Sequence, residues 1–299
     1  MGRALAEASP VCRAVFEEAD EALGEPISRL CFDGPAEQLT MTEYTQPAIL
    51  TVSVAAARLL AERGIQPQVV AGHSLGEYSA HVAAGTLAFG DTVRVVRRRG
   101  AYMQEAVPHG AGAMAAILGG EPAAVEQACA EASADGEVVS PANLNAPGQI
   151  VIAGSREGVA RAIERALALG AKKAVLLPVS APFHCALMTP AEERLAPELR
   201  ALPARDPRIP VVANVDGEPK VTAAAAIDAL VAQVSAPVQW EAVVRRLSSL
   251  GVRTYVEVGP GTVLSGLVKK IDREARVASL ERPDQLAAVE ALVRAGASV

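Results

Sequence analysis

The sequence predicts an α/β fold in which helices flank a mainly parallel sheet and a smaller subdomain is inserted into the larger one. Two observations support this prediction. Amphipathic helical segments alternate along the chain with short apolar runs, as they do where helices connect parallel strands. Between residues 112 and 179 the order of the expected strands and helices changes, which indicates a separate unit.

The first 111 residues contain clear start and stop signals for helices. Ser9 can cap a helix that has Pro10 at its first position, and Gly24 can end that helix. A second helix follows Pro47 and ends at Gly64. We expect helices at 10–23, 47–64, 77–84 and 91–107, and a short buried strand at 68–71.

Residues 112–179 follow the order strand, helix, strand, strand, helix and strand, which is the order of a ferredoxin-like subdomain. The chain then returns to the large domain, which therefore comprises 1–111 and 180–299. In the insertion we expect strands at 113–118, 137–140, 149–153 and 174–179, and helices at 122–132 and 157–169. After it we expect strands at 211–214, 254–258 and 277–280, helices at 223–234, 240–250 and about 263–268, and a final helix.

The composition limits the classes of function. The chain has 299 residues, is 51% hydrophobic but only 3% aromatic, and carries a formal net charge of −6. Binding to nucleic acid requires a basic face for the phosphates or aromatic side chains on which bases stack, so no nucleic-acid partner is expected. Neither a signal peptide nor a run apolar enough to cross a bilayer is evident, so no membrane partner is expected.

The four cysteines are too far apart in sequence for a CxxC motif or a zinc site. They are Cys12, Cys31, Cys129 and Cys185. No cluster of His, Cys and carboxylate residues has the spacing of metal ligands, so neither a metal nor a cofactor is expected. Reduced thiols of this kind are typical of a cytoplasmic protein.

The turn at 72–76 has the sequence Gly-His-Ser-Leu-Gly and matches the G-x-S-x-G pattern of a nucleophile elbow. A strand precedes the turn and a helix follows it, which would expose the Ser74 hydroxyl at a helix N-terminus, where the dipole favours developing negative charge. The alternative is a glycine-rich turn with an ordinary capping serine. The context favours a nucleophilic Ser74 in a hydrolase-like sheet.

A nucleophilic serine needs a base, and the candidates are His73, His81, His109 and His184. The first adjoins the serine, the second lies on the following helix, and the third lies in a loop between the two domains. His184 follows the last strand of the insertion, where a return loop can supply half of an active site. His184 is therefore the expected base, with an ordinary buried histidine as the alternative. No histidine follows it, unlike in the α/β-hydrolases, whose histidine lies near the chain end.

One arginine falls on the apolar side of its helix. In the helix at 91–107, Arg94, Arg97 and Arg98 lie opposite the valines, whereas Arg99 lies within the apolar arc. A buried guanidinium requires an anion. That anion is either a buried carboxylate of the protein or the carboxylate of a substrate, and the second possibility suggests transfer of an acid-bearing acyl group.

Several collinear segments resemble the family of malonyl-CoA:acyl carrier protein transacylases of fatty-acid synthesis, and the related acyltransferase domains of polyketide synthases. The segments extend almost from end to end: 44–48, 72–79, 98–104, 143–154, 180–188, 237–240 and 257–261. The resemblance implies a two-step, ping-pong transfer of a malonyl group from malonyl-CoA through an ester on Ser74 to the phosphopantetheine thiol of acyl carrier protein. It also implies a monomer.

The resemblance assigns roles to further residues. His184 is implied as general base and then general acid, and the backbone N–H of Leu75 as an oxyanion donor. Arg99 is implied to pair with the malonyl carboxylate. A backbone carbonyl near Gln239 is implied to orient the histidine. Gln46 and Phe183 are implied to bind substrate; the bulky Phe183 goes with malonyl rather than methylmalonyl groups.

Three further points concern the surface for the carrier protein, the start of the chain and the alternative functions. Carrier proteins of this family are acidic, and the basic residues expected to meet one are Lys172, Lys173, Lys269 and Lys270. Family members begin with a buried strand and a Gly-Gln-Gly loop that supplies a second oxyanion donor, whereas here the pattern begins at the following helix. We expect a misassigned start; the alternatives are a truncated sequence and impaired activity. The alternative functions are a serine hydrolase or thioesterase, a malonyl transferase of a polyketide pathway, and an inactive module that binds carrier protein.

Overall fold

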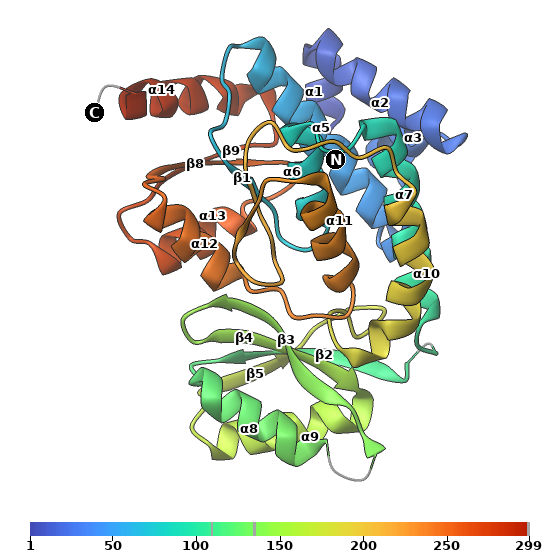
Figure 1. Ribbon diagram of the computed structural model, residues 1–299, viewed down its shortest axis with the longest axis vertical. Coiled ribbons are helices and arrows are strands. Elements are labelled where there is room, and N and C mark those ends of the chain that lie inside the picture. Colours follow the sequence, from blue (N-terminus) through green and yellow to red (C-terminus); the bar gives the residue numbers. More distant parts are fainter. Residues whose placement is uncertain (109, 134–135, 298–299) are drawn as a thin grey trace.

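The chain is a mixed α/β structure in a computed structural model that describes residues 1–108, 110–133 and 136–297. Helices surround two small sheets in one part, and a larger sheet with two helices forms the other part (Figure 1). The described helices of the N-terminal part are α1 (Arg3–Ala8), α2 (Pro10–Leu23), α3 (Ile27–Asp33), α4 (Ala36–Leu39), α5 (Thr42–Glu62), α6 (Leu75–Ala84) and α7 (Phe89–Glu105). Those that follow are α8 (Pro122–Ala132), α9 (Arg156–Ala168), α10 (Thr189–Arg200), α11 (Ala223–Ala232), α12 (Trp240–Ser249), α13 (Val263–Ile271) and α14 (Leu286–Ala297).

The longest of the described strands, of seven or eight residues, lie between residues 112 and 155. The described strands are β1 (Val70–Ala71), β2 (Gly112–Leu118), β3 (Val139–Ala146), β4 (Gln149–Ser155), β5 (Lys173–Leu176), β6 (Val211–Val212), β7 (Pro219–Lys220), β8 (Thr254–Val258) and β9 (Arg276–Leu280). Two single turns of 3₁₀ helix, η2 (Ala186–Met188) and η3 (Pro283–Gln285), precede α10 and α14. Within the described ranges, none of the helices combines the length and the apolar character needed to cross a membrane.

The helix signals of the N-terminal segment are confirmed at α2. The Ser9 hydroxyl accepts a hydrogen bond from the Cys12 N–H at 3.4 Å, and Gly24 ends the helix in the left-handed conformation with φ of 66°. The helix expected after Pro47 begins earlier, at Thr42. The bond from the Thr45 N–H to the Met41 carbonyl closes a first turn upstream of the proline, which therefore lies inside the helix.

In place of one mainly parallel sheet, the described residues outside 112–176 contain two small sheets. β1 pairs in parallel with β6 and β6 pairs antiparallel with β7, whereas β8 and β9 form a separate parallel pair. Beyond Val212 the backbone ladder ends, and the Asn214 side chain donates to the Gly72 carbonyl and accepts from the Ser74 N–H. Most of the apolar core is supplied by helices, with its largest cluster centred on α2, α5, α7 and α10.

Residues 112–176 form a four-stranded antiparallel sheet with strand order β3-β4-β2-β5. The helices α8 and α9 cover one face of this sheet and enclose a separate apolar cluster (Figure 1). β3 also contacts the rest of the chain, because Leu144 and Ala142 exchange backbone hydrogen bonds with Val238. The end of β3 is thereby held beside the turn at residues 72–76.

Candidate active site

The turn between β1 and α6 holds Ser74 in an unusual backbone conformation. Its φ is 51° and its ψ is −112°, a region that residues other than glycine rarely adopt. The turn is tight, because a Cβ atom at Gly72 would lie 2.0 Å from the carbonyl group of Gly76. No acceptor for the N–H of Leu75 is found among the described residues, so this donor at the helix N-terminus points to a site where negative charge can be stabilised.

Ser74 and His184 are in direct contact although 110 positions separate them. The Ser74 Oγ lies 2.7 Å from Nε2 of His184, and Nδ1 of the ring lies 2.9 Å from the backbone carbonyl of Gln233. A carbonyl can only accept, so Nδ1 carries the proton and Nε2 accepts the serine proton. His184 itself has a positive φ of 60°.

The imidazole of His184 is kept neutral. Burial, and secondly the positive charge of Arg99, lower the pKa of His184 to about 3. No carboxylate orients the ring; the backbone carbonyl of Gln233 does so. The expectation of a carbonyl near Gln239 is thus corrected to Gln233, six positions earlier. The Gln239 carbonyl instead accepts from the Val243 N–H at 2.9 Å in the first turn of α12.

Arg99 is buried, as its place in the apolar arc predicts, with only 1% of its surface exposed. Its guanidinium donates to Oε1 of Gln46 at 2.6 Å, to Oε1 of Gln233 at 2.9 Å and to the Ser74 Oγ at 3.2 Å. All three acceptors are neutral. The neighbouring Arg97 instead pairs with two surface carboxylates. Within the part of the chain that the structure describes, Arg99 forms no ion pair, so its charge is available to an anion in the site.

Three further buried residues complete the site, and no role was predicted for them from the sequence: Asn214, Glu77 and Gln233. The Asn214 side chain accepts from the Ser74 N–H at 2.6 Å and donates to the Gly72 carbonyl at 2.7 Å, which ties the two sides of the turn together. Glu77 accepts from the Asn214 N–H at 3.0 Å and from the Gln233 amide at 2.7 Å. Burial raises the pKa of Glu77 to about 7. The sequence signals that could have found two of these residues are the place of Glu77 in the segment 72–79 and the polar Asn214 at the end of an expected strand.

Neither His73 nor His81 hydrogen-bonds to Ser74. Nε2 of His73 lies 2.8 Å from Oδ1 of Asn145, and its ring lies against Trp240. His81 is fully buried without a hydrogen-bond partner among the described residues, and burial lowers its pKa to about 4. His109 lies outside the described residues. Phe183 is half-buried next to His184 and packs against the apolar residues behind the site.

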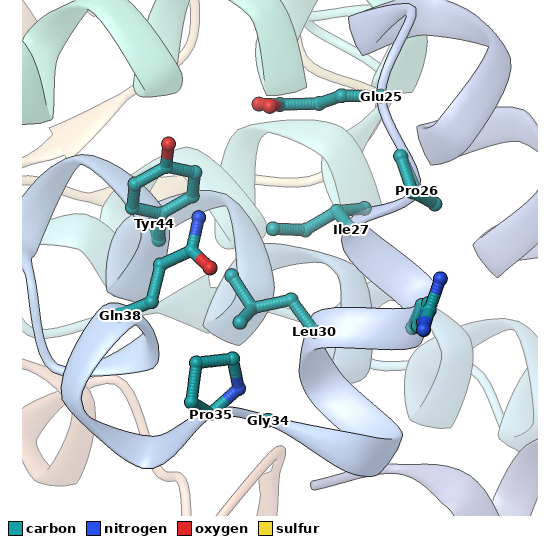
Figure 2. Close-up of a pocket in the computed structure, with 9 residues that line it drawn as sticks. Glu25, Pro26, Ile27, Leu30, Gly34, Pro35, Gln38 and Tyr44 are labelled. Carbon is teal, nitrogen blue, oxygen red and sulfur yellow. The ribbon is translucent and has the colours of Figure 1, made fainter.

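The structure also has a surface pocket away from Ser74. Figure 2 shows this pocket of about 280 Å³ beside α3 and α4, with Glu25 and Tyr44 on its wall. Arg97 pairs with Glu25 and lies 3.9 Å from the centre of the Tyr44 ring. Glu25 and Tyr44 are thus engaged by Arg97, and no lining residue of this pocket hydrogen-bonds to Ser74.

Comparisons with known proteins agree with this geometry. A family model described as acyl transferase domain matches residues 1–295. The chain belongs to the acyl transferase domain family. Another member, the malonyl CoA-acyl carrier protein transacylase of Escherichia coli (strain K12), is 50% identical over 285 residues, which is 95% of this chain and 92% of that protein.

Solved structures of acyl transferases are equally similar. An acyl carrier protein S-malonyltransferase from Vibrio cholerae has a TM-score of 0.94 and 47% identity, and the match covers 97% of this chain and 94% of that one. A malonyl-transacylase solved in complex with a type II polyketide synthase acyl carrier protein has a TM-score of 0.94 and 44% identity, with coverage of 98% and 94%. The site residues of this acyl transferase therefore lie on a framework shared with enzymes of known fold.

The tight turn at Ser74 predicts opposite outcomes for two glycine substitutions. Gly72→Ala should destabilise the protein by about 3 kcal/mol or more, because the backbone of Gly76 cannot move out of the way. Gly76→Ala should be neutral or stabilising, since its Cβ would meet open space in the first turn of α6. Urea unfolding followed by circular dichroism measures both. Equal free energies of unfolding for the two variants would contradict this account of the turn.

Proposed function

We propose that this acyl transferase moves the malonyl group of malonyl-CoA to the phosphopantetheine thiol of acyl carrier protein, in fatty-acid biosynthesis. One observation carries the proposal: a single serine hydroxyl lies 2.7 Å from a neutral imidazole and 3.2 Å from a buried guanidinium without an ion pair among the described residues. That combination suits a nucleophile whose acyl group ends in a carboxylate. The names of relatives that match over nearly the whole chain support the same reaction.

In the first step Ser74 attacks the thioester carbonyl of malonyl-CoA. Its proton passes to Nε2 of His184 as the new C–O bond forms, and the N–H of Leu75 donates to the developing oxyanion. When the intermediate collapses, the C–S bond breaks and His184 returns the proton to the sulfur of CoA. The products are malonyl-Ser74 and free CoA.

The second step reverses these roles. The phosphopantetheine thiol attacks the ester carbonyl, and His184 takes the thiol proton. The ester C–O bond breaks and the proton returns to Oγ of Ser74. The exchange converts one thioester into another of similar free energy, so the enzyme must favour the thiol over water.

Selection of the malonyl group is assigned to Arg99, with Gln46 as its support. A carboxylate brought beside Ser74 would find a guanidinium held by neutral acceptors, and the resulting pair would be strong because the site is buried. An acetyl group lacks that carboxylate. Phe183, next to His184, is proposed to restrict the space beside the α-carbon and so to favour malonyl over methylmalonyl groups.

We also propose a division into domains and a location. The order of elements in 112–179, the strand order β3-β4-β2-β5 and the separate apolar cluster support an inserted ferredoxin-like subdomain. The segments 1–111 and 180–299 would form the large domain. Its two small sheets would together make up the core of a hydrolase-like fold. The four buried thiols are unpaired, which supports a cytoplasmic location.

The carrier protein is proposed to meet the four lysines noted in the sequence. The stem of Lys172 lies over Gly119, whose N–H donates to the Gly148 carbonyl at 2.8 Å. On the other side, Nζ of Lys270 lies 3.2 Å from Oε1 of Gln149. Both lysines thus border the tip of the β3–β4 hairpin, and their neighbours Lys173 and Lys269 are also exposed.

This hairpin connects the lysines to the site. Asn145, four residues before Gln149, contacts His73 beside Ser74. None of the four lysines forms an ion pair within the described ranges. An acidic partner docked on them would therefore bring its thiol-bearing arm close to the nucleophile without displacing an internal carboxylate.

The intact mass of the protein after mixing with malonyl-CoA tests the proposed function. We expect one malonyl adduct that is absent in Ser74→Ala and that disappears when holo acyl carrier protein is added, with the malonyl group recovered on the carrier. Release of free malonate with an unlabelled carrier would indicate a thioesterase. The absence of any adduct on the parent protein would indicate an inactive binding module, and either result would overturn the proposal.

The low pKa of His184 predicts the pH dependence of the first step. Because His184 titrates at about 3, it stays neutral and able to accept a proton at pH 5, so the acylation rate should fall less than about twofold between pH 8 and pH 5. A histidine of ordinary pKa would lose about 30-fold over that range. Single-turnover formation of malonyl-Ser74 measures the rate, with circular dichroism confirming the folded state. Because Glu77 has a pKa of about 7, the profile is also measured in Glu77→Gln, and an inflection near pH 6.5 that persists in this variant would contradict the prediction.

Charge reversal tests the lysine surface. Lys172→Glu with Lys270→Glu should raise the KM for acyl carrier protein by about tenfold at low ionic strength and less at high ionic strength. Malonyl-Ser74 formation from malonyl-CoA should not change. The matched control is Arg13→Glu with Arg63→Glu, two exposed arginines on α2 and at the end of α5. A loss of acylation by malonyl-CoA in the lysine variant would instead assign these lysines to the phosphates of CoA.

A further inference from the structure

Gln233 links the groups on which the reaction depends. It is fully buried just after α11, and every polar group of its side chain is engaged. Its Oε1 accepts from Arg99 at 2.9 Å, and its Nε2 donates to the Ser74 carbonyl at 3.0 Å and to Oε2 of Glu77 at 2.7 Å. Its backbone carbonyl accepts from Nδ1 of His184 at 2.9 Å.

The orientation of the amide is fixed by its neighbours. A guanidinium can only donate, so the amide oxygen must face Arg99. The Ser74 carbonyl can only accept, so the amide nitrogen must face Ser74, and Glu77 is reached by the second hydrogen of the same nitrogen. The side chain therefore stands between a buried carboxyl group and a buried guanidinium and is hydrogen-bonded to both.

This arrangement keeps the charge of Arg99 unneutralised. Glu77 is a buried carboxyl group that interacts electrostatically with Arg99, yet the two form no ion pair because the Gln233 amide lies between them. Gln46, the other amide on the guanidinium, is neutral as well. A direct ion pair would occupy the donors that a substrate carboxylate needs.

We propose that Gln233 is a positioning residue that determines substrate specificity: it separates Glu77 from Arg99, so that the carboxylate of the acyl group becomes the counter-ion of the arginine. This inference rests on the proposed function. The same residue also holds His184 through its backbone, so the carboxylate clamp and the base are fixed to one point of the chain.

The substitution Gln233→Glu tests the inference, because it keeps the shape of the side chain and places a carboxylate on Arg99. We expect kcat/KM for acylation by malonyl-CoA to fall by about 30-fold or more, and that for acetyl-CoA to change less than about threefold. The ratio of kcat/KM for malonyl-CoA to that for acetyl-CoA would therefore fall. Gln66→Glu, which makes the same charge change at an exposed position, should leave the ratio as it is.

A second variant separates specificity from folding. Gln233→Glu combined with Glu77→Gln exchanges the acid and the amide, which retains the net charge and one hydrogen bond between the two side chains. We expect its thermal stability to recover towards that of the parent protein while the malonyl-to-acetyl ratio stays low. Recovery of the ratio in the double variant would overturn the inference, because the loss would then come from burying two acids.

The outcomes distinguish the inference from the function on which it rests. If the parent protein forms no malonyl adduct, the proposed function fails. If the parent forms the adduct and Gln233→Glu keeps the parent ratio of malonyl to acetyl acylation, the function stands and the role of Gln233 is refuted.

Discussion

The site depends on the two hydrogen bonds that Asn214 makes across the turn at Ser74. The serine backbone is held in a conformation that is unfavourable for any residue with a Cβ, and such strain persists only where surrounding bonds enforce it. Asn214 is brought to the turn by β6, whose parallel pairing with β1 spans two residues. Once the turn is fixed, Ser74 stands at the N-cap of α6, and the N–H of Leu75 and the buried Glu77 follow in its first turn.

Two distant segments then converge on this fixed point. The loop after the insertion delivers His184, and the end of α11 delivers Gln233, which the histidine requires as an acceptor. Neither segment belongs to the elements that carry Ser74. Their meeting is supported by apolar contacts behind the loop, where Phe183 and Cys185 pack against β2 and β4. The sheet of residues 112–176 thus packs directly against the loop that carries His184.

Local signals explain which parts could be predicted from sequence. The helix at 10–23 was predictable because its cap and its stop are adjacent in the chain, and the burial of Arg99 followed from helical periodicity alone. The helix α10 was not anticipated, although Pro190 stands at its start, and α3 and α4 are too short to show a period. The buried amide network could not be predicted from the sequence, because Gln233 and Glu77 are 156 positions apart and a buried glutamine has no distinguishing sequence pattern. For the same reason the acceptor of His184 was expected near Gln239.

The use of a carbonyl in place of a carboxylate behind His184 has a consequence for the fate of the acyl-enzyme. With a neutral acceptor on one side and Arg99 nearby, the imidazolium form gains little stabilisation, so the ring is a weak base. A weak base assists an attacking thiol, whose ordinary pKa is about 8.5, far better than it assists water, whose pKa is about 15.7. The discrimination between transfer and hydrolysis is thereby built partly into the proton affinity of one ring, independently of how well the site keeps water out.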